Sequence, residues 1–86
     1  MQIGRTERFK KAWKRLLETD KKSARKAILH LVVNIDYPSL RVKKVKGTST
    51  IWEARVNLRT RITFEMSGDK IILRNIGQHD EVLKQP

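Results

Sequence analysis

The spacing of apolar residues changes once along this chain, near Pro38, from a helical period to the alternation of β-strands. Before Pro38 the apolar positions recur every three or four residues, which indicates amphipathic helices. After Pro38 they alternate with polar residues, which indicates strands buried on one face. Because the helices precede the strands, we expect an α+β fold in which helices cover one face of a sheet.

Two helices are expected before Pro38, over about residues 6–17 and 21–33. Thr6 and Asp20 are residue types that cap helix N-termini, and each stands at the start of one apolar stripe. Only residues 18–20 separate the two helices, so we expect them to form an antiparallel hairpin.

The strands are expected at residues 51–57, 61–66 and 71–76, with a further strand starting at residues 40–42. Ile62, Phe64 and Met66 share the parity that should face the core. The run 71–73 is apolar on both faces, which predicts a central position in the sheet. A turn is expected at residues 67–69, and residues 77–86 are expected to be a partly ordered tail.

The length of 86 residues fits one domain, and we expect it to span residues 1–86. The whole pattern predicts an N-terminal antiparallel helical hairpin packed on one face of a three- to four-stranded antiparallel β-sheet. The chain contains no cysteine, which excludes disulfides, cysteine-ligated zinc and iron–sulfur clusters. Its stability must therefore come from an apolar core.

The net charge is +11, from 20 Lys and Arg against 9 Asp and Glu. Such a charge predicts a polyanionic partner, with nucleic acid first and an acidic protein or an anionic lipid surface next. The longest apolar run, 27–33, is too short to span a bilayer, and residues 1–8 lack the apolar stretch of a secretory signal. We therefore expect a cytoplasmic protein without a membrane partner.

Arg55 and Arg61 should project from the polar face of the sheet on neighbouring strands. Two guanidinium groups held side by side can bind one phosphate group. The alternative is that they form cross-strand ion pairs with Glu53 and Glu65, as exposed charges on sheets often do.

His79 follows the last expected strand and could transfer a proton near neutral pH. His30 lies beside apolar residues of the second helix and is expected to serve packing. We expect neither histidine to bind a metal, since the two lie in different elements without a recognisable ligand spacing.

A basic loop before Gly47 is the remaining candidate site. It is suited to a phosphate backbone, and the alternative is a solvated surface loop. Its cations are Arg41, Lys43, Lys44 and Lys46.

Several features in a fixed order resemble the RelE/ParE superfamily of bacterial and archaeal type II toxins. They are a Lys-rich loop ending in Gly47, a strand led by Trp52, Arg61 followed by an apolar and aromatic strand, and a Gly-x-His motif ending at His79. The similar stretches are residues 39–48, 51–56, 61–65 and 73–83, with the first helix, around residues 8–11, also in the expected place. The resemblance therefore covers most of the chain.

This resemblance implies a ribosome-dependent mRNA endonuclease that inhibits translation and is held inactive by an acidic antitoxin. It implies cleavage by attack of the RNA 2′-hydroxyl on the adjacent phosphate, without a metal or another cofactor. The implied partners are the antitoxin, mRNA on the ribosome and ribosomal RNA. The gyrase-inhibiting branch of the superfamily and a non-catalytic RNA-binding module are the alternative functions.

The resemblance also assigns roles to residues. Arg61 matches the arginine that binds the scissile phosphate, Arg55 a basic strand residue, and His79 the basic residue after the last strand. Family nucleases often carry Lys at the position of Glu53 and a Tyr near the carboxyl terminus, which this chain lacks. Glu53 or His79 would then supply the base. The further expected RNA contacts are Arg41, Lys43, Lys44, Lys46, Arg59 and Arg74.

Overall fold

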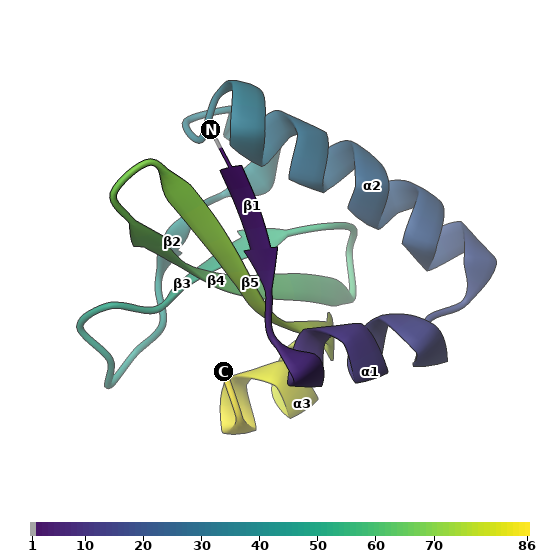
Figure 1. Cartoon of the computed structure of the whole chain (residues 1–86). Helices are drawn as coiled ribbons and strands as arrows, with labels where there is room; N and C mark the ends of the chain where they lie inside the picture. The colour runs from purple at the N-terminus through teal and green to yellow at the C-terminus, as the bar shows by residue number, and fades with distance from the viewer. Residues whose placement is uncertain (1) are drawn as a thin grey trace.

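The computed structural model describes residues 2–86 as helices on a five-stranded sheet (Figure 1). In chain order the elements are β1 (Gln2–Arg5), α1 (Glu7–Arg15), α2 (Glu18–Val33), the 3₁₀ helix η1 (Pro38–Leu40), β2 (Lys43–Lys44), β3 (Trp52–Arg55), β4 (Thr60–Ser67), β5 (Lys70–Gln78) and α3 (His79–Lys84). None of these helices, within residues 2–86, is long and apolar enough to cross a membrane.

The sheet has the order β1-β5-β4-β3-β2, and β1 is parallel to β5 while the other neighbours are antiparallel. The α+β class is confirmed, whereas the three- to four-stranded, wholly antiparallel sheet is wrong. β1 was not predicted from the sequence, because its four residues contain a single apolar side chain, Ile3. The strand expected at residues 40–42 is also wrong, because η1 ends at Leu40 and Arg41 adopts a left-handed conformation. The central position of β5 is confirmed.

Thr6 caps α1 as expected, since its hydroxyl oxygen accepts a hydrogen bond from the Phe9 N–H at 3.1 Å. The N-cap of α2 is Leu17 rather than Asp20, because α2 begins at Glu18 and Asp20 lies in its first turn. Acidic residues there stabilise the positive end of the helix dipole. Figure 1 shows α1 and α2 diverging from the short joint between them, so the expected antiparallel hairpin of helices is not confirmed.

The apolar core lies between the two helices and one face of the sheet. Its buried side chains come from α1, α2, η1 and the strands: Phe9, Ala24, Ala27, Leu31, Leu40, Ala54, Ile62, Phe64, Ile71, Leu73 and Ile76. Burial of a large side chain such as Phe64 contributes about 2 kcal/mol. Met66, expected in this core, is 46 % exposed near the end of β4.

The carboxyl-terminal residues are ordered, which corrects the expected partly ordered tail. β5 continues to Gln78 and α3 follows it directly, with Val82 only 1 % exposed. The Thr63 hydroxyl and the Arg74 Nε–H donate to the carbonyl oxygen of Pro86, at 2.9 and 3.2 Å. Residues 79–86 thus cover part of the second sheet face, and Thr63 is fully buried there.

Candidate active site

A small hollow of about 210 Å³ collects side chains from separate parts of the chain. We call it the Arg61 hollow, and its residues are Arg41, Lys43, Glu53, Arg55, Arg61 and His79. The four residues that the sequence predicts as catalytic all line it, together with two of the cations predicted to contact RNA. The fold therefore brings together, in one concave place, residues up to 38 positions apart, from Arg41 to His79.

Arg55 and Arg61 are register partners on the antiparallel strands β3 and β4. The alternative of cross-strand ion pairs is wrong for both arginines, since within residues 2–86 neither lies within 4 Å of a carboxylate. Glu65 instead pairs with Arg74 at 3.2 Å. The two guanidinium groups are thus available to an anionic ligand.

Arg61 is held at one end by the turn between β3 and β4. Its Nη1 donates to the carbonyl oxygens of Asn57 at 2.8 Å, Thr60 at 3.1 Å and Leu58 at 3.4 Å. A guanidinium group has further N–H donors besides those on Nη1. The turn thus fixes the position of the group and leaves donors for a ligand.

Asn57 organises this turn, although it was not predicted as a functional residue from the sequence. Its Oδ1 accepts from the backbone N–H groups of Arg59 and Thr60, at 3.1 and 3.0 Å. Its Nδ2 donates to Asp20 Oδ1 at 2.9 Å, which ties the turn to α2. An asparagine at the end of a strand, followed by a polar turn, is the sequence signal for such an Asx turn.

The charges of the Arg61 hollow act on one another. Partial burial lowers the pKa of Arg61, and the positive charges of Arg55 and, to a smaller extent, Arg41 lower it further. The negative charge of Glu53 raises the same pKa and so offsets part of this shift. A site in which neighbouring cations repel one another is stabilised by binding an anion.

Glu53 is the buried acid of the site and is only 4 % exposed. On β3 it lies between its register partners Lys43 on β2 and Thr63 on β4. Its carboxylate is the only one lining the Arg61 hollow among residues 2–86. Glu53 therefore stands where a carboxylate can exchange a proton with a ligand held by the arginines.

His79 is the first residue of α3, and both its backbone and its ring contact neighbouring residues. Its N–H donates to the Arg59 carbonyl oxygen at 3.0 Å, and its Nδ1 lies 3.2 Å from Asp80 Oδ1. The side chain is 45 % exposed, so solvent and ligand can both reach it. Within residues 2–86, no group of three or more His, Asp or Glu side chains could hold a metal ion.

The other predicted RNA contacts lie outside the Arg61 hollow. Arg59 lines a shallow hollow beside it together with Arg61 and His79, and Lys46 is exposed in the turn before Gly47. Lys44 lies over the ring of Trp52, with its Nζ 5.3 Å from the ring centroid. Arg74 is engaged in the ion pair with Glu65 and in the contact with Pro86, so it lines none of these surfaces.

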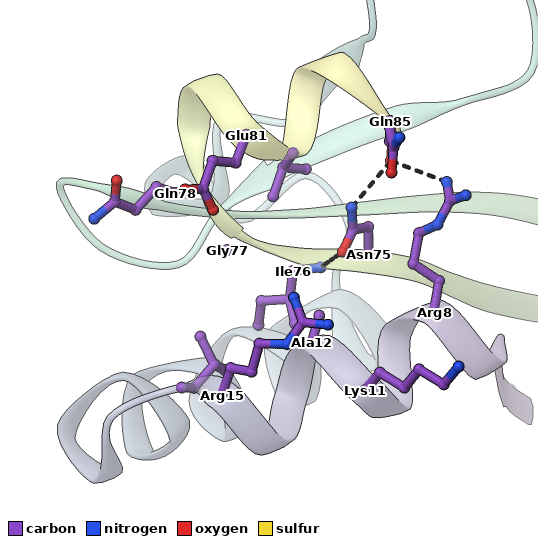
Figure 2. A pocket seen from close by; sticks show the side chains of 12 residues that line it. Arg8, Lys11, Ala12, Arg15, Asn75, Ile76, Gly77, Gln78, Glu81 and Gln85 are labelled. Carbon is purple, nitrogen blue, oxygen red and sulfur yellow. Dashed lines mark hydrogen bonds between the residues drawn. The ribbon is translucent and has the colours of Figure 1, made fainter.

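A larger groove of about 630 Å³ lies between α1 and α3 (Figure 2). Figure 2 shows Arg8, Lys11 and Arg15 along the α1 side of this groove. The Asn75 side chain and Arg8 both donate to the carbonyl oxygen of Gln85, at 3.0 and 3.4 Å, and so fix the end of α3. The groove therefore carries a cationic wall and also holds the helix that begins with His79.

No protein-family model matches this sequence, and no curated protein matches it. Solved structures do match. YafQ from E. coli strain BL21(DE3) has a TM-score of 0.80 at 13% identity, covering 94% of this chain and 96% of YafQ. A metal-bound toxin from Helicobacter pylori has a TM-score of 0.79 at 19% identity, and the match covers 95% of this chain and 98% of that toxin.

A chain from the RelB–RelE antitoxin–toxin complex of Methanococcus jannaschii has a TM-score of 0.74 at 23% identity. The match covers 96% of this chain and 99% of that one. At such identities the similarity establishes the three-dimensional arrangement. The chain therefore has the fold of RelE/ParE-type toxins.

Proposed function

We propose that this chain is the toxin of a type II toxin–antitoxin pair, a cytoplasmic endoribonuclease that cuts mRNA on the ribosome and so inhibits translation. The observation that carries the proposal is the Arg61 hollow, where cations, a buried carboxylate and an imidazole converge. The toxin fold supports it, since YafQ and the RelB–RelE complex share that fold.

The proposed reaction is an internal transfer within the RNA, and it needs no metal. The 2′-hydroxyl loses its proton to a base, and its oxygen forms a bond to the adjacent phosphorus. The bond from phosphorus to the 5′-oxygen then breaks, and that oxygen takes a proton from an acid. The products are a 2′,3′-cyclic phosphate and a 5′-hydroxyl.

The residues of the Arg61 hollow supply what this reaction requires. Arg55 and Arg61 bind the non-bridging oxygens and stabilise the charge that grows on them in the transition state. Glu53 and His79 transfer the protons, one as base and the other as acid. Lys43 and Arg41 attract the RNA backbone to the rim of the hollow.

The net charge of +11 supports two kinds of macromolecular partner for the proposed toxin. Ribosomal RNA fits the cationic wall of Arg8, Lys11 and Arg15, because a phosphate backbone binds rows of cations. An acidic antitoxin would neutralise the same charge and cover the hollow. Co-purification from a two-gene plasmid that carries the neighbouring reading frame tests the second partner.

Expression of the wild-type chain in a bacterial host, followed by primer extension on cellular mRNA, tests the function. New 5′-ends within translated codons, together with growth arrest, are the expected result. A DNA-damage response without mRNA cuts would show a gyrase inhibitor instead. Salt-dependent RNA binding without growth arrest would show a non-catalytic binding module.

A further inference from the structure

A second hollow, of about 610 Å³, lies between α2, η1 and the end of β3. We call it the Lys26 hollow. Its polar residues include Ser23, Lys26, His30, Arg41, Arg55 and Asn57. The proposed function makes no use of Ser23 or Lys26, which lie on α2 away from the Arg61 hollow.

Arg41 and Arg55 line both hollows, so the two adjoin each other at the edge of the sheet. The edge of β3 is open there, because β2 pairs only with Trp52 and Glu53. A polymer that has one phosphate in the Arg61 hollow must continue in both directions along its backbone. The Lys26 hollow offers the next cationic surface on one of these sides.

Arg41 occupies an uncommon backbone conformation at the junction of the two hollows. Its φ and ψ are 46° and 49°, and it is the only non-glycine residue with a positive φ within residues 2–86. This left-handed region costs a residue with a Cβ about 1–2 kcal/mol relative to the right-handed one. Arginine thus stands where glycine would be favoured, and a strained residue beside two hollows is a candidate for a functional role.

The Lys26 hollow is cationic, and one aromatic ring, that of His30, lines it. Lys26, Arg41 and Arg55 lie in no ion pair within residues 2–86, and the nearby Asp20 is engaged by Asn57. The ring of His30 packs on Tyr37, with centroids 4.0 Å apart. Cations beside an aromatic ring suit a phosphate and a base of single-stranded nucleic acid.

We infer that the Lys26 hollow binds the nucleotide next to the scissile phosphate of a single-stranded RNA. Lys26 and Arg41 contact its phosphate, and His30 lies beside its base. This inference rests on the proposed function, because it extends the RNA path from the Arg61 hollow. It adds a binding residue, Lys26, that acts on affinity for longer RNA and takes no part in the chemistry.

Binding of fluorescein-labelled RNA, followed by fluorescence anisotropy at several salt concentrations, tests the inference. The two probes are a dinucleotide and a hexanucleotide, both methylated at every 2′-oxygen so that neither can be cleaved. The wild type should bind the hexanucleotide about tenfold or more tightly than the dinucleotide, because additional phosphates are contacted. Lys26→Ala should lose about fivefold in affinity for the hexanucleotide only. The slope of its log affinity against log salt concentration should become shallower by about one.

Lys22→Ala is the matched control, because Lys22 is also an exposed lysine of α2 but lies outside both hollows. It should change hexanucleotide affinity less than twofold. The inference would be overturned if the two variants lost equal affinity for the hexanucleotide, or if the wild type bound the hexanucleotide no more tightly than the dinucleotide. So would a Lys26→Ala variant that binds RNA normally but binds an acidic protein partner weakly.

The assay also separates this inference from the proposed function, because it requires no cleavage. If the wild type cuts mRNA but its greater affinity for the hexanucleotide does not depend on Lys26, only the binding site in the Lys26 hollow is refuted. If the wild type binds the hexanucleotide more tightly through Lys26 but cuts no mRNA, the binding site is supported and the proposed nuclease function is refuted.

Discussion

Arg55 and Arg61 stand directly opposite each other on antiparallel strands, two like charges without a carboxylate partner within residues 2–86. Like charges at such positions destabilise a sheet, whereas opposite charges stabilise it. The pair therefore costs folding stability, and a phosphate between the two guanidinium groups would reverse that cost. Stability and function are expected to respond in opposite directions at Arg55.

Replacing Arg55 by alanine should lower the rate of RNA cleavage about 100-fold, because one donor to the phosphorane is lost. The same change should leave the free energy of unfolding unchanged or raise it by up to about 0.5 kcal/mol, since a like-charge contact is removed. Arg61→Ala should lose cleavage as well, but also about 1 kcal/mol of stability, because the turn carbonyls lose their donor. Urea denaturation measures the free energy of unfolding of both variants, and a cleavage assay on programmed ribosomes measures their cleavage rates.

Lys70→Ala is a suitable control for these arginine variants, because Lys70 is an exposed cation of β5 outside the Arg61 hollow. It should retain growth arrest in the host. Growth arrest that persists undiminished in Arg61→Ala would remove Arg61 from the mechanism.

Glu53→Gln and His79→Ala should each lower kcat about 100- to 10,000-fold with little change in KM, because each removes one proton-transferring group. Binding of a 2′-methylated RNA should be retained by both variants. The double variant should be about as slow as the slower single variant, since the two groups act in one reaction. Glu81→Gln, on the same helix as His79 but outside the Arg61 hollow, should behave as wild type.

Thr63→Val should loosen α3 without changing the shape of the sheet. The hydroxyl of the buried Thr63 is a donor to Pro86, and its loss should cost about 1 kcal/mol of stability. Amide exchange over residues 79–84 should then become about fivefold faster. Thr50→Val is the control, because Thr50 is exposed in the turn before β3. Equal exchange rates in the two variants would show that Thr63 does not anchor α3.

Arg41→Gly should separate stability from activity at one position. Glycine adopts the left-handed conformation of Arg41 without a Cβ penalty, so the variant should be at least as stable as wild type despite the greater freedom of its unfolded chain. Its affinity for RNA should nevertheless fall, because the cation shared by both hollows is gone. Lys44→Gly, in β2, removes an equal charge but should lose about 0.5–1 kcal/mol of stability. A clear loss of stability in Arg41→Gly would contradict this account.

The local pattern of the sequence was sufficient for the two long helices and for β3, β4 and β5, since each has a sustained apolar period. It was also sufficient to predict that Arg55 and Arg61 share a sheet face, because parity along paired strands sets this. β1 was missed because its pairing with β5 depends on contacts distant in sequence. α3 was missed because its burial depends on Val82 alone and on backbone contacts to Thr63 and Arg74.

The common sheet face of Arg55 and Arg61 was thus easier to predict than the surroundings of the two side chains. Glu53 was expected on an exposed polar face, yet it is nearly fully buried in the structure. The fixing of Arg61 by turn carbonyls could not be derived from strand parity, because it depends on the turn geometry that Asn57 imposes. The Lys26 hollow, in turn, arises only where α2 meets the open end of β3.

The short strand β2 consists of two exposed lysines at one border of the sheet. An unpaired strand edge invites pairing with the edge of another molecule, and lysines are among the residues by which natural proteins prevent such edge-to-edge aggregation. Lys43 therefore has two effects, since it lines the Arg61 hollow and also repels neighbouring copies of the chain. Apolar replacements at this border would be expected to lower solubility before they lowered folding stability.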